Sequence, residues 1–355
     1  MSPSIEARTD MFTPGEYPLP DGPISSRSCR NVRAHAAAVT VLSAETTTAE
    51  SCSPALGPPG GGEVVTAQSI GEAGGMTTEN SARAAGHAQL GSFRVNRMGF
   101  GTMKLTGWPQ GKQPTRDTAI ALLRRAVELG VNHIDTSQFY DRDGMNANEL
   151  IREALHPYPE DLVLVTKFAA IEPGLTADGL RKNVEVNLRT LGLDRLHVVN
   201  LRVGAAIAPV EESLEAPLTA LAALQAEGAI EHLGISNVTR AQFDQARDLA
   251  PFVCVQNAYN VAMRGDDPLI DACEAAGIAY VPFFPVGGFQ PVLTEHLGTV
   301  AERHGVSTPQ VALAWLLARS PSILLIPGTS DPRHLEENIA AGGLRLTEED
   351  LALIG

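Results

Sequence analysis

Short apolar runs alternate with amphipathic stretches from about residue 90 to the end of the chain. Most of the apolar runs are rich in Val, Ile and Leu and lack strict alternation, which is typical of strands buried on both faces. These runs cover residues 131–135, 162–167, 197–202, 231–236, 253–257, 279–284 and 323–327. An initial strand near residues 99–103 precedes them, so the pattern predicts eight strands.

The stretches between the strands repeat apolar residues every three or four positions, which predicts helices. In residues 117–129, Ala119, Leu123 and Ala126 share one face, and Gly130 ends the helix. Further helices are expected over residues 146–155, 176–191, 211–225, 239–249, 267–276, 308–318 and 331–341. Repeated strand–helix units over this length predict an α/β fold of the (β/α)8 TIM-barrel type, which typically takes about 250 residues.

A doubly wound open sheet is the main alternative for such a pattern. That fold places a glycine-rich phosphate loop after an early strand, and the chain contains no GxGxxG motif. We therefore favour the barrel. Residues 93–96 are expected to belong to a short N-terminal hairpin that plugs the bottom of the barrel.

The first 88 residues differ in composition from the rest of the chain. They contain no Lys and only two aromatic residues, Phe12 and Tyr17. A segment of this kind buries too little apolar surface to offset the entropy lost on ordering. We therefore predict a disordered extension over residues 1–88 and one barrel domain over residues 89–355.

Two further hypotheses concern this extension. Arg27, Arg30 and Arg33 precede a mildly apolar run, which resembles a targeting segment, but the run is weak, internal and preceded by an acidic start. The alternative that we favour is that natural translation starts at Met76, shortly before the periodic pattern begins. Residues 1–75 would then not belong to the native protein.

Charge and cysteine content exclude several classes of protein. The chain has 41 acidic and 27 basic residues, for a net charge of -14, whereas a nucleic-acid binder needs a basic face. No stretch approaches the ~20 apolar residues of a membrane span. The four cysteines show no metal-binding or paired spacing, so we expect no metal site, no disulfide framework and a cytoplasmic location.

Polar residues end nearly every predicted strand, at the barrel mouth where (β/α)8 enzymes carry their chemistry. Five motifs contain them: HIDTSQFY at residues 133–140, VTK at 165–167, GISN at 234–237, VQNAYN at 255–260 and IPGTS at 326–330. In order and spacing they resemble the aldo-keto reductase family, from about residue 90 to the C-terminus. The resemblance implies a nicotinamide-dependent enzyme that reduces the carbonyl group of a small molecule.

Three more segments resemble a bacterial subgroup of this family that reduces pyridoxal: YPEDL at residues 158–162, VVNLRV at 198–203 and YVPFFPVGGF at 280–289. This resemblance implies reduction of pyridoxal to pyridoxine with NADPH, a step of vitamin B6 salvage. Two alternatives stay open: a broad-specificity aldehyde and ketone reductase, and a nicotinamide-binding regulatory subunit without turnover. NAD as cofactor, and a monomer or a small homo-oligomer, also stay open.

Carbonyl reduction needs a hydride, which the nicotinamide supplies, and a proton from a nearby acid. A tyrosine with its ordinary pKa near 10 is a poor match to neutral pH, but a neighbouring ammonium stabilises the phenolate. The resemblance assigns Tyr140 as the acid, Lys167 as the ammonium and Asp135 as the carboxylate that holds Lys167. We expect Lys167 to bring the pKa of Tyr140 toward the working range.

The position that usually holds a histidine in this family falls on Arg202. A guanidinium can polarise a carbonyl oxygen, but it does not exchange protons at neutral pH. We therefore expect Arg202 to act as a donor without relaying protons; a structural ion-pair role is the alternative. Asn200 and Trp108 are expected to line the substrate pocket.

The same resemblance assigns the cofactor residues. Ser236, Asn237 and Gln256 correspond to residues that bind the nicotinamide carboxamide, and Phe283 to a ring that stacks on the nicotinamide. The remaining residues are expected to contact the pyrophosphate, the 2′-phosphate and the adenine: Pro285, Gly287, Gly288, Gly328, Thr329, Ser330, Arg333, His334, Glu337 and Asn338. Gly328 and His334 stand where NADP-preferring members carry Lys and Arg.

Overall fold

The computed structural model of the chain describes residues 81–109, 111–169, 176–204, 207–287 and 295–355. The expectations for residues 1–80, including the start at Met76, and the role of Gly288 lie outside these ranges and stay predictions. The boundary at residue 88 is too late, because η2 (Ala82–Ala85) and β1 (His87–Leu90) already form part of the fold. Ser81 donates from Oγ to the carbonyl of Leu129, which ties this segment to the rest of the fold.

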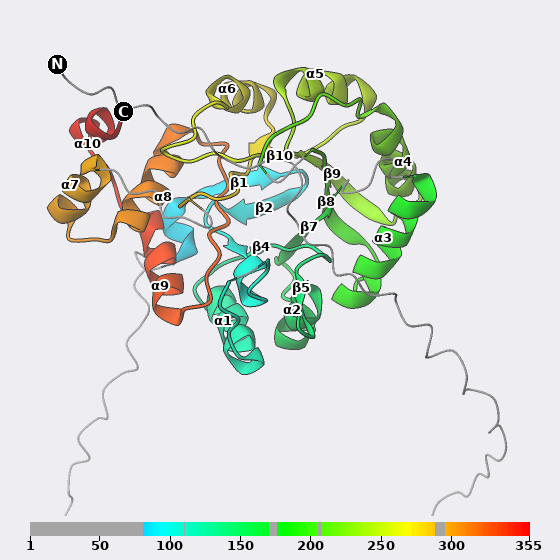
Figure 1. The fold of residues 1–355 in the computed structure, drawn as a ribbon, viewed down its shortest axis with the longest axis horizontal. Coiled ribbons are helices and arrows are strands. Elements are labelled where there is room, and N and C mark those ends of the chain that lie inside the picture. The colour runs from blue at the N-terminus through cyan, green and yellow to red at the C-terminus, as the bar shows by residue number, and fades with distance from the viewer. Residues whose placement is uncertain (1–80, 110, 170–175, 205–206, 288–294) are drawn as a thin grey trace, which may run out of the picture. The chain divides into compact units, whose positions relative to one another are not determined.

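The centre of the fold is a parallel sheet whose strands follow one another in sequence order (Figure 1). Its strands are β3 (Phe100–Gly101), β4 (His133–Asp135), β7 (Val163–Ala169), β8 (Leu196–Arg202), β9 (Ile230–Ser236), β10 (Cys254–Gln256) and β11 (Ala279–Tyr280). The segment 323–325 closes the sheet through parallel bridges from Ile323 to Tyr280 and from Leu325 to Met98. The predicted barrel is thereby confirmed, and the doubly wound alternative is wrong.

Helices surround the strands as a ring (Figure 1). They are α1 (Arg116–Glu128), α2 (Ala147–Leu155), α3 (Ala177–Leu191), α4 (Glu215–Ala226), α5 (Arg240–Leu249), α6 (Asp267–Ala276), α7 (Glu295–His304), α8 (Thr308–Arg319), α9 (Pro332–Ala340) and α10 (Glu348–Ile354). Each helix turns its apolar residues inward. In α1, for example, Thr115 caps the first turn and the side chains of Ala119, Leu123 and Ala126 are buried.

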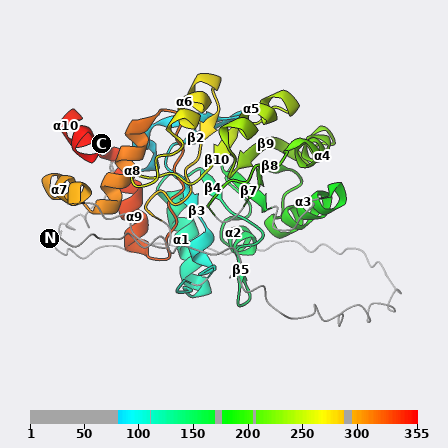
Figure 2. The same cartoon turned by 45° about the horizontal axis from the view of Figure 1, so that its top comes forward.

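The expected hairpin is present and fills the bottom of the barrel. In Figure 1 it lies across the middle of the ring of strands, and Figure 2 shows the same ring tilted. The hairpin strands β1 and β2 (Phe93–Asn96) pair antiparallel. Leu90 and Val95 of the hairpin are buried in one apolar cluster with interior residues of the barrel strands. His197, at the start of β8, packs against the ring of Phe93 with 5.6 Å between ring centroids. The bottom is therefore filled, which leaves the opposite end of the strands for chemistry.

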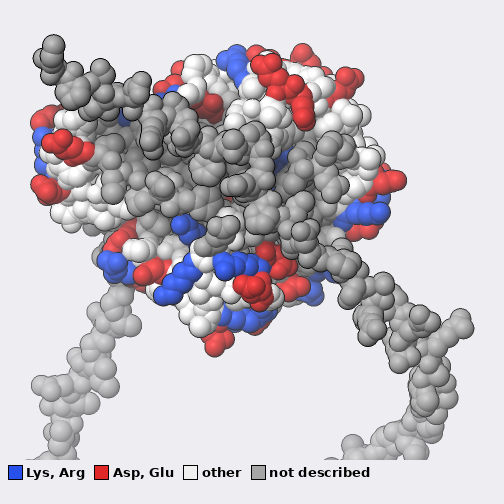
Figure 3. Space-filling model, in the orientation of Figure 1, with Lys and Arg blue, Asp and Glu red and all other residues white. Residues whose placement is uncertain are grey.

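Charged residues of both signs are interspersed over the described residues of the face in Figure 3. Arginines there lie beside carboxylates, and ion pairs such as Arg116 with Glu153 join neighbouring helices. This mixed pattern differs from the continuous basic surface that phosphate backbones require. Among the described helices, none is both long and apolar enough to cross a membrane.

Candidate active site

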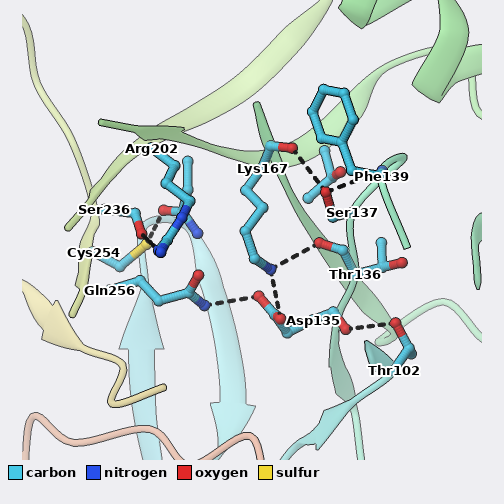
Figure 4. A network of polar contacts seen from close by, with 12 residues as sticks. Thr102, Asp135, Thr136, Ser137, Phe139, Lys167, Arg202, Ser236, Cys254 and Gln256 are labelled. Carbon is cyan, nitrogen blue, oxygen red and sulfur yellow. Dashed lines mark hydrogen bonds and ion pairs between the residues drawn. The ribbon is translucent and has the colours of Figure 1, made fainter. Parts of the chain in front are cut away.

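A buried ion pair lies at the mouth of the barrel (Figure 4). Lys167, on β7, donates from Nζ to Oδ1 of Asp135, which ends β4, over 2.7 Å. The same ammonium donates to the carbonyl oxygen of Thr136 over 2.9 Å. The side chains of Lys167 and Asp135 are 8% and 5% exposed, so solvent screens their attraction weakly. The two strand-end residues are therefore brought together as expected.

Gln256 completes the surroundings of the carboxylate. It ends β10 and donates from Nε2 to Oδ2 of Asp135 over 2.8 Å. Its Oε1 is buried and has no hydrogen-bond partner among the described residues. A buried acceptor without a donor is unfavourable, so this oxygen is suited to receive an N–H group from a bound molecule.

Tyr140 lies in the loop after β4, with its ring 5.1 Å from Nζ of Lys167. Burial raises the pKa of the phenol above its ordinary value of 10.0, and the positive charge of Lys167 offsets part of that shift. Lys167 lowers this pKa as expected, but desolvation of the phenolate outweighs the attraction, so the net shift of the pKa is upward. Burial lowers the pKa of Lys167, but Asp135 more than compensates, so the ammonium stays charged.

Trp108 covers the other side of Tyr140. Its ring centroid lies 5.5 Å from that of Tyr140, with the ring planes at 45°. Both side chains are half-buried. The two rings therefore form an aromatic wall at the mouth, where the sequence places a substrate pocket.

Arg202 ends β8, the strand next to the β7 strand of Lys167. Its guanidinium carbon lies 4.8 Å from the ring centroid of Phe283, a cation–π contact. It also donates from Nη1 to Oγ of Ser236 over 3.2 Å. The charge of Arg202 acts on Tyr140 and lowers the pKa of its phenol, against the larger effect of burial. Two of the expected cofactor residues thus hold the guanidinium in the site.

Two asparagines of the expected site form contacts within the protein. Asn237 donates from Nδ2 to the carbonyls of Val203 and Ala208 over 2.8 and 3.0 Å, so its amide group anchors the loop after β8. Asn200 is fully buried, and its Oδ1 accepts a hydrogen bond from Sγ of Cys254 over 3.2 Å. Its buried Nδ2 has no hydrogen-bond partner among the described residues, and its place in the substrate pocket stays a prediction.

The loop after β11 turns sharply beside Phe283. Phe283 packs edge-on against Phe284, with 5.2 Å between ring centroids. The N–H of Gly287 donates to the carbonyl of Phe284, and Gly287 has a φ of 97°, which a residue with a side chain rarely adopts. Pro285 between them is buried. Because Gly287 has no side chain, its backbone is open to a bound group. The assignment of this loop to the pyrophosphate stays a prediction.

Gly328 stands at a place where no side chain fits. A Cβ atom there would lie 2.6 Å from the carbonyl oxygen of Gly101 on the first barrel strand. The absence of the lysine that NADP-preferring relatives carry therefore has a packing reason in this chain. Any phosphate contact at Gly328 is limited to its backbone.

The N-terminus of α9 is occupied by its own cap. Asp331 accepts hydrogen bonds at Oδ1 from the N–H groups of Arg333 and His334 over 2.8 and 3.4 Å. These hydrogen bonds lower the pKa of Asp331, so a carboxylate occupies the N-terminus of α9. Thr329 Oγ1 accepts from the N–H of Asp331 over 3.0 Å. The amides of Arg333 and His334 therefore already have an acceptor within the chain.

Side chains around this cap still offer polar groups. Arg333 and His334 are exposed and lie together, with 3.1 Å between Nη2 and Nε2, and Arg333 also reaches Oε1 of Glu337 over 3.3 Å. Ser330 is half-buried in the loop before α9. Asn338 is buried on α9, one turn after His334. The expected 2′-phosphate and adenine residues thus lie on one short loop and helix.

Sequence reasoning missed two contributors to the site. The backbone carbonyl of Thr136 accepts a hydrogen bond from Lys167. Every residue has a backbone carbonyl, so the residue types along the chain do not predict this contact. The cap on α9 had a signal: Asp331 directly precedes Pro332, and an Asp followed by a Pro is typical of a helix start.

A model of the Aldo/keto reductase family matches residues 97–355. The chain belongs to the aldo/keto reductase family. It is 52% identical over 276 residues to the Pyridoxine 4-dehydrogenase of Escherichia coli, an alignment that covers 75% of this chain and 96% of that relative. Membership makes the chain an oxidoreductase.

Solved structures of family members share the fold. A thermostable aldo-keto reductase in complex with the inhibitor epalrestat matches with a TM-score of 0.66 and 30% identity, over 76% of this chain and 98% of that one. An aldo/keto reductase from Klebsiella pneumoniae in complex with NADP and acetate matches with a TM-score of 0.63 and 26% identity, over 74% and 90%. The described barrel is therefore that of a family whose solved members include an NADP complex.

Proposed function

We propose that this aldo/keto reductase is a cytoplasmic, NADPH-dependent enzyme that reduces the aldehyde of pyridoxal to the alcohol pyridoxine. The observation that carries the substrate is the 52% identity to a Pyridoxine 4-dehydrogenase along 96% of that relative's length. The arrangement of the site supports proton donation, because Asp135, Lys167 and Tyr140 lie together at the mouth. The family relationship and the NADP complex of a relative support the cofactor.

Each residue of the site has a separate role in the proposed reaction. NADPH supplies a hydride to the carbonyl carbon when it is bound. Tyr140 keeps its proton at neutral pH, because burial holds the pKa of its phenol high, and it donates that proton to the carbonyl oxygen. Lys167 stabilises the phenolate that remains, and Asp135 holds Lys167 in place. Arg202, on the neighbouring strand, adds a second positive charge at the mouth.

The residues present fit a nicotinamide. The buried Oε1 of Gln256 has no partner in the described part of the chain and would accept from the carboxamide N–H₂. Phe283, which packs against Arg202 and Phe284, would offer a ring to the nicotinamide, and Ser236 an additional hydroxyl. On the phosphate side, Arg333 and His334 are exposed cationic or polar groups that would approach a 2′-phosphate.

The test is a comparison of specificity constants for the full chain. NADPH consumption is measured with pyridoxal, benzaldehyde, butanal and cyclohexanone, and repeated with NADH. The proposal predicts a kcat/KM for pyridoxal at least about tenfold above the others. Equal turnover of the simple carbonyls would replace it with a broad-specificity reductase. Tight NADPH binding without turnover of any carbonyl would replace it with a regulatory role.

A further inference from the structure

Arg202 carries a fixed positive charge into the mouth of the barrel. The ring of Phe283, 4.8 Å from the guanidinium carbon, and the hydroxyl of Ser236, 3.2 Å from Nη1, hold it from two sides. Its charge acts on the phenol of Tyr140. Lys167 and Arg202 come from neighbouring strands, β7 and β8, and both lie at the mouth (Figure 4), so a substrate carbonyl that approaches Tyr140 also approaches the cation of Arg202.

A guanidinium recognises a different pattern of atoms from a histidine. It stays charged at every physiological pH, and its planar N–H groups form a fork that binds two neighbouring oxygens at once. A neutral imidazole presents one N–H donor at a time. Arg202 therefore suits a substrate in which a second, negatively charged oxygen lies next to the carbonyl oxygen.

We propose that Arg202 makes the site selective for aromatic aldehydes with an ionised hydroxyl on the ring carbon next to the formyl group. This inference rests on the proposed function and names the feature of pyridoxal that the site recognises. Pyridoxal carries a hydroxyl next to its formyl group. Without a cation, the ionised hydroxyl would repel the negative charge that grows on the carbonyl oxygen as hydride arrives, whereas the fork of Arg202 binds both oxygens.

A matched pair of aldehydes tests this directly. 3-Hydroxypyridine-4-carboxaldehyde and pyridine-4-carboxaldehyde differ only in the neighbouring hydroxyl. We compare their kcat/KM values, as a ratio, in the wild-type full chain and in Arg202→Gln and Arg202→Lys. The ratio should fall by about tenfold or more in Arg202→Gln, as expected for a lost charge-assisted contact, and by less in Arg202→Lys, which keeps the charge but not the fork.

Arg240→Gln is the control. Arg240 also lies near a phenylalanine ring, 5.8 Å from the centroid of Phe243, but on α5 outside the barrel. Its substitution should leave the ratio unchanged. A ratio that is the same in wild type and Arg202→Gln, or that falls equally in Arg240→Gln, would overturn the proposal.

A second readout needs no turnover. Calorimetry measures the affinity of both aldehydes for the wild-type protein saturated with NADP⁺, across the pH range in which the hydroxyl of the first aldehyde ionises. Binding of the hydroxylated aldehyde should strengthen as that hydroxyl ionises, and the pyridine aldehyde should show no such change. A flat profile for both would overturn the role of Arg202, whereas failure of every aldehyde to turn over with NADPH would overturn the proposed function instead.

Discussion

The ion pair of Asp135 and Lys167 sets the electrostatics of the site. Both charges are buried, and each is met by a further polar group, Gln256 for the carboxylate and the carbonyl of Thr136 for the ammonium. Removal of one member of such a pair leaves an uncompensated buried charge, which typically costs about 3–5 kcal/mol. The positive charge near Tyr140 is therefore part of the fold as well as of the chemistry.

Tyr140→Phe should abolish most of the activity without harm to the fold. The substitution removes the proton donor and leaves the ring against Trp108. We expect kcat for pyridoxal to fall by about 10²–10⁴-fold, the usual contribution of a general acid, with unchanged affinity for NADPH. Steady-state kinetics and fluorescence titration with NADPH measure the two quantities.

Tyr158→Phe is the matched control for this prediction. Tyr158 precedes the start of β7 and lies outside the site. It donates from its hydroxyl to the carbonyl of Leu191 over 2.6 Å. Its loss should cost about 1 kcal/mol of stability and leave kcat unchanged. Equal kinetic losses in both variants would show that Tyr140 acts through stability and not as the acid.

Residue identities at strand ends were predictable, but their partners were not. Asp135 and Lys167 stand at the ends of adjacent strands, so their meeting followed from the barrel. The choice of Gln256 as a partner of Asp135, and the burial of Asn200 against Cys254, depend on distances across the barrel interior. A sequence pattern carries no such distances, and for this reason the protein contacts of Asn200 and Asn237 could not be predicted.

At the scale of elements, the loop after the last barrel segment is confined by the first strand. Gly328→Lys, which restores the residue of NADP-preferring relatives, should destabilise the chain because its Cβ would lie 2.6 Å from the carbonyl of Gly101. We expect a loss of about 1–3 kcal/mol, measured by urea unfolding. An unchanged stability together with tighter NADPH binding would contradict the packing argument.

The cap of α9 should weaken binding of the 2′-phosphate. Asp331→Asn keeps a good helix cap but removes the negative charge beside Arg333 and His334. We expect the KM for NADPH to fall by about two- to fivefold, as for a charge near a helix terminus. NADH, which lacks the phosphate, is the internal control, and an equal change for both cofactors would count against this reading.

Elements with strong patterns were predicted well, and short or weakly patterned ones were not. The apolar runs placed β7, β8 and β9, and the three-to-four periodicity placed α1 and α3. The predictions missed α7 and α10, which lie outside the repeating units. The start of α4 was placed at residue 211, but the helix begins at Glu215, because Leu214 is held by the side chain of Gln245 on α5.

At the scale of the whole molecule, a buried histidine links stability to pH. His133 is 2% exposed in the barrel wall, and its ring nitrogens have no hydrogen-bond partner among the described residues. Burial lowers the pKa of this imidazole from 6.5 to about 4. In the unfolded chain this imidazole therefore binds a proton below about pH 6.5, whereas in the folded chain it binds one only near pH 4. The free energy of unfolding therefore decreases as the pH falls through this window.

The expected loss is about 3 kcal/mol between neutral pH and pH 4. Urea unfolding at several pH values measures it, in wild type and in His133→Gln, which cannot titrate. The variant should be less dependent on pH over this window, although other histidines also contribute. Identical pH slopes in the two proteins would contradict the assignment to His133.

The transfer of hydride from NADPH to the formyl carbon of pyridoxal is the central claim, and isotope labelling tests it most directly. The full chain is incubated with pyridoxal and NADPH that carries deuterium at both positions of C4 of the nicotinamide, and the product is analysed by mass spectrometry. The account predicts pyridoxine with one deuterium on the former aldehyde carbon, and almost no product with Tyr140→Phe. Unlabelled pyridoxine, or no pyridoxine from the wild-type chain, would contradict it.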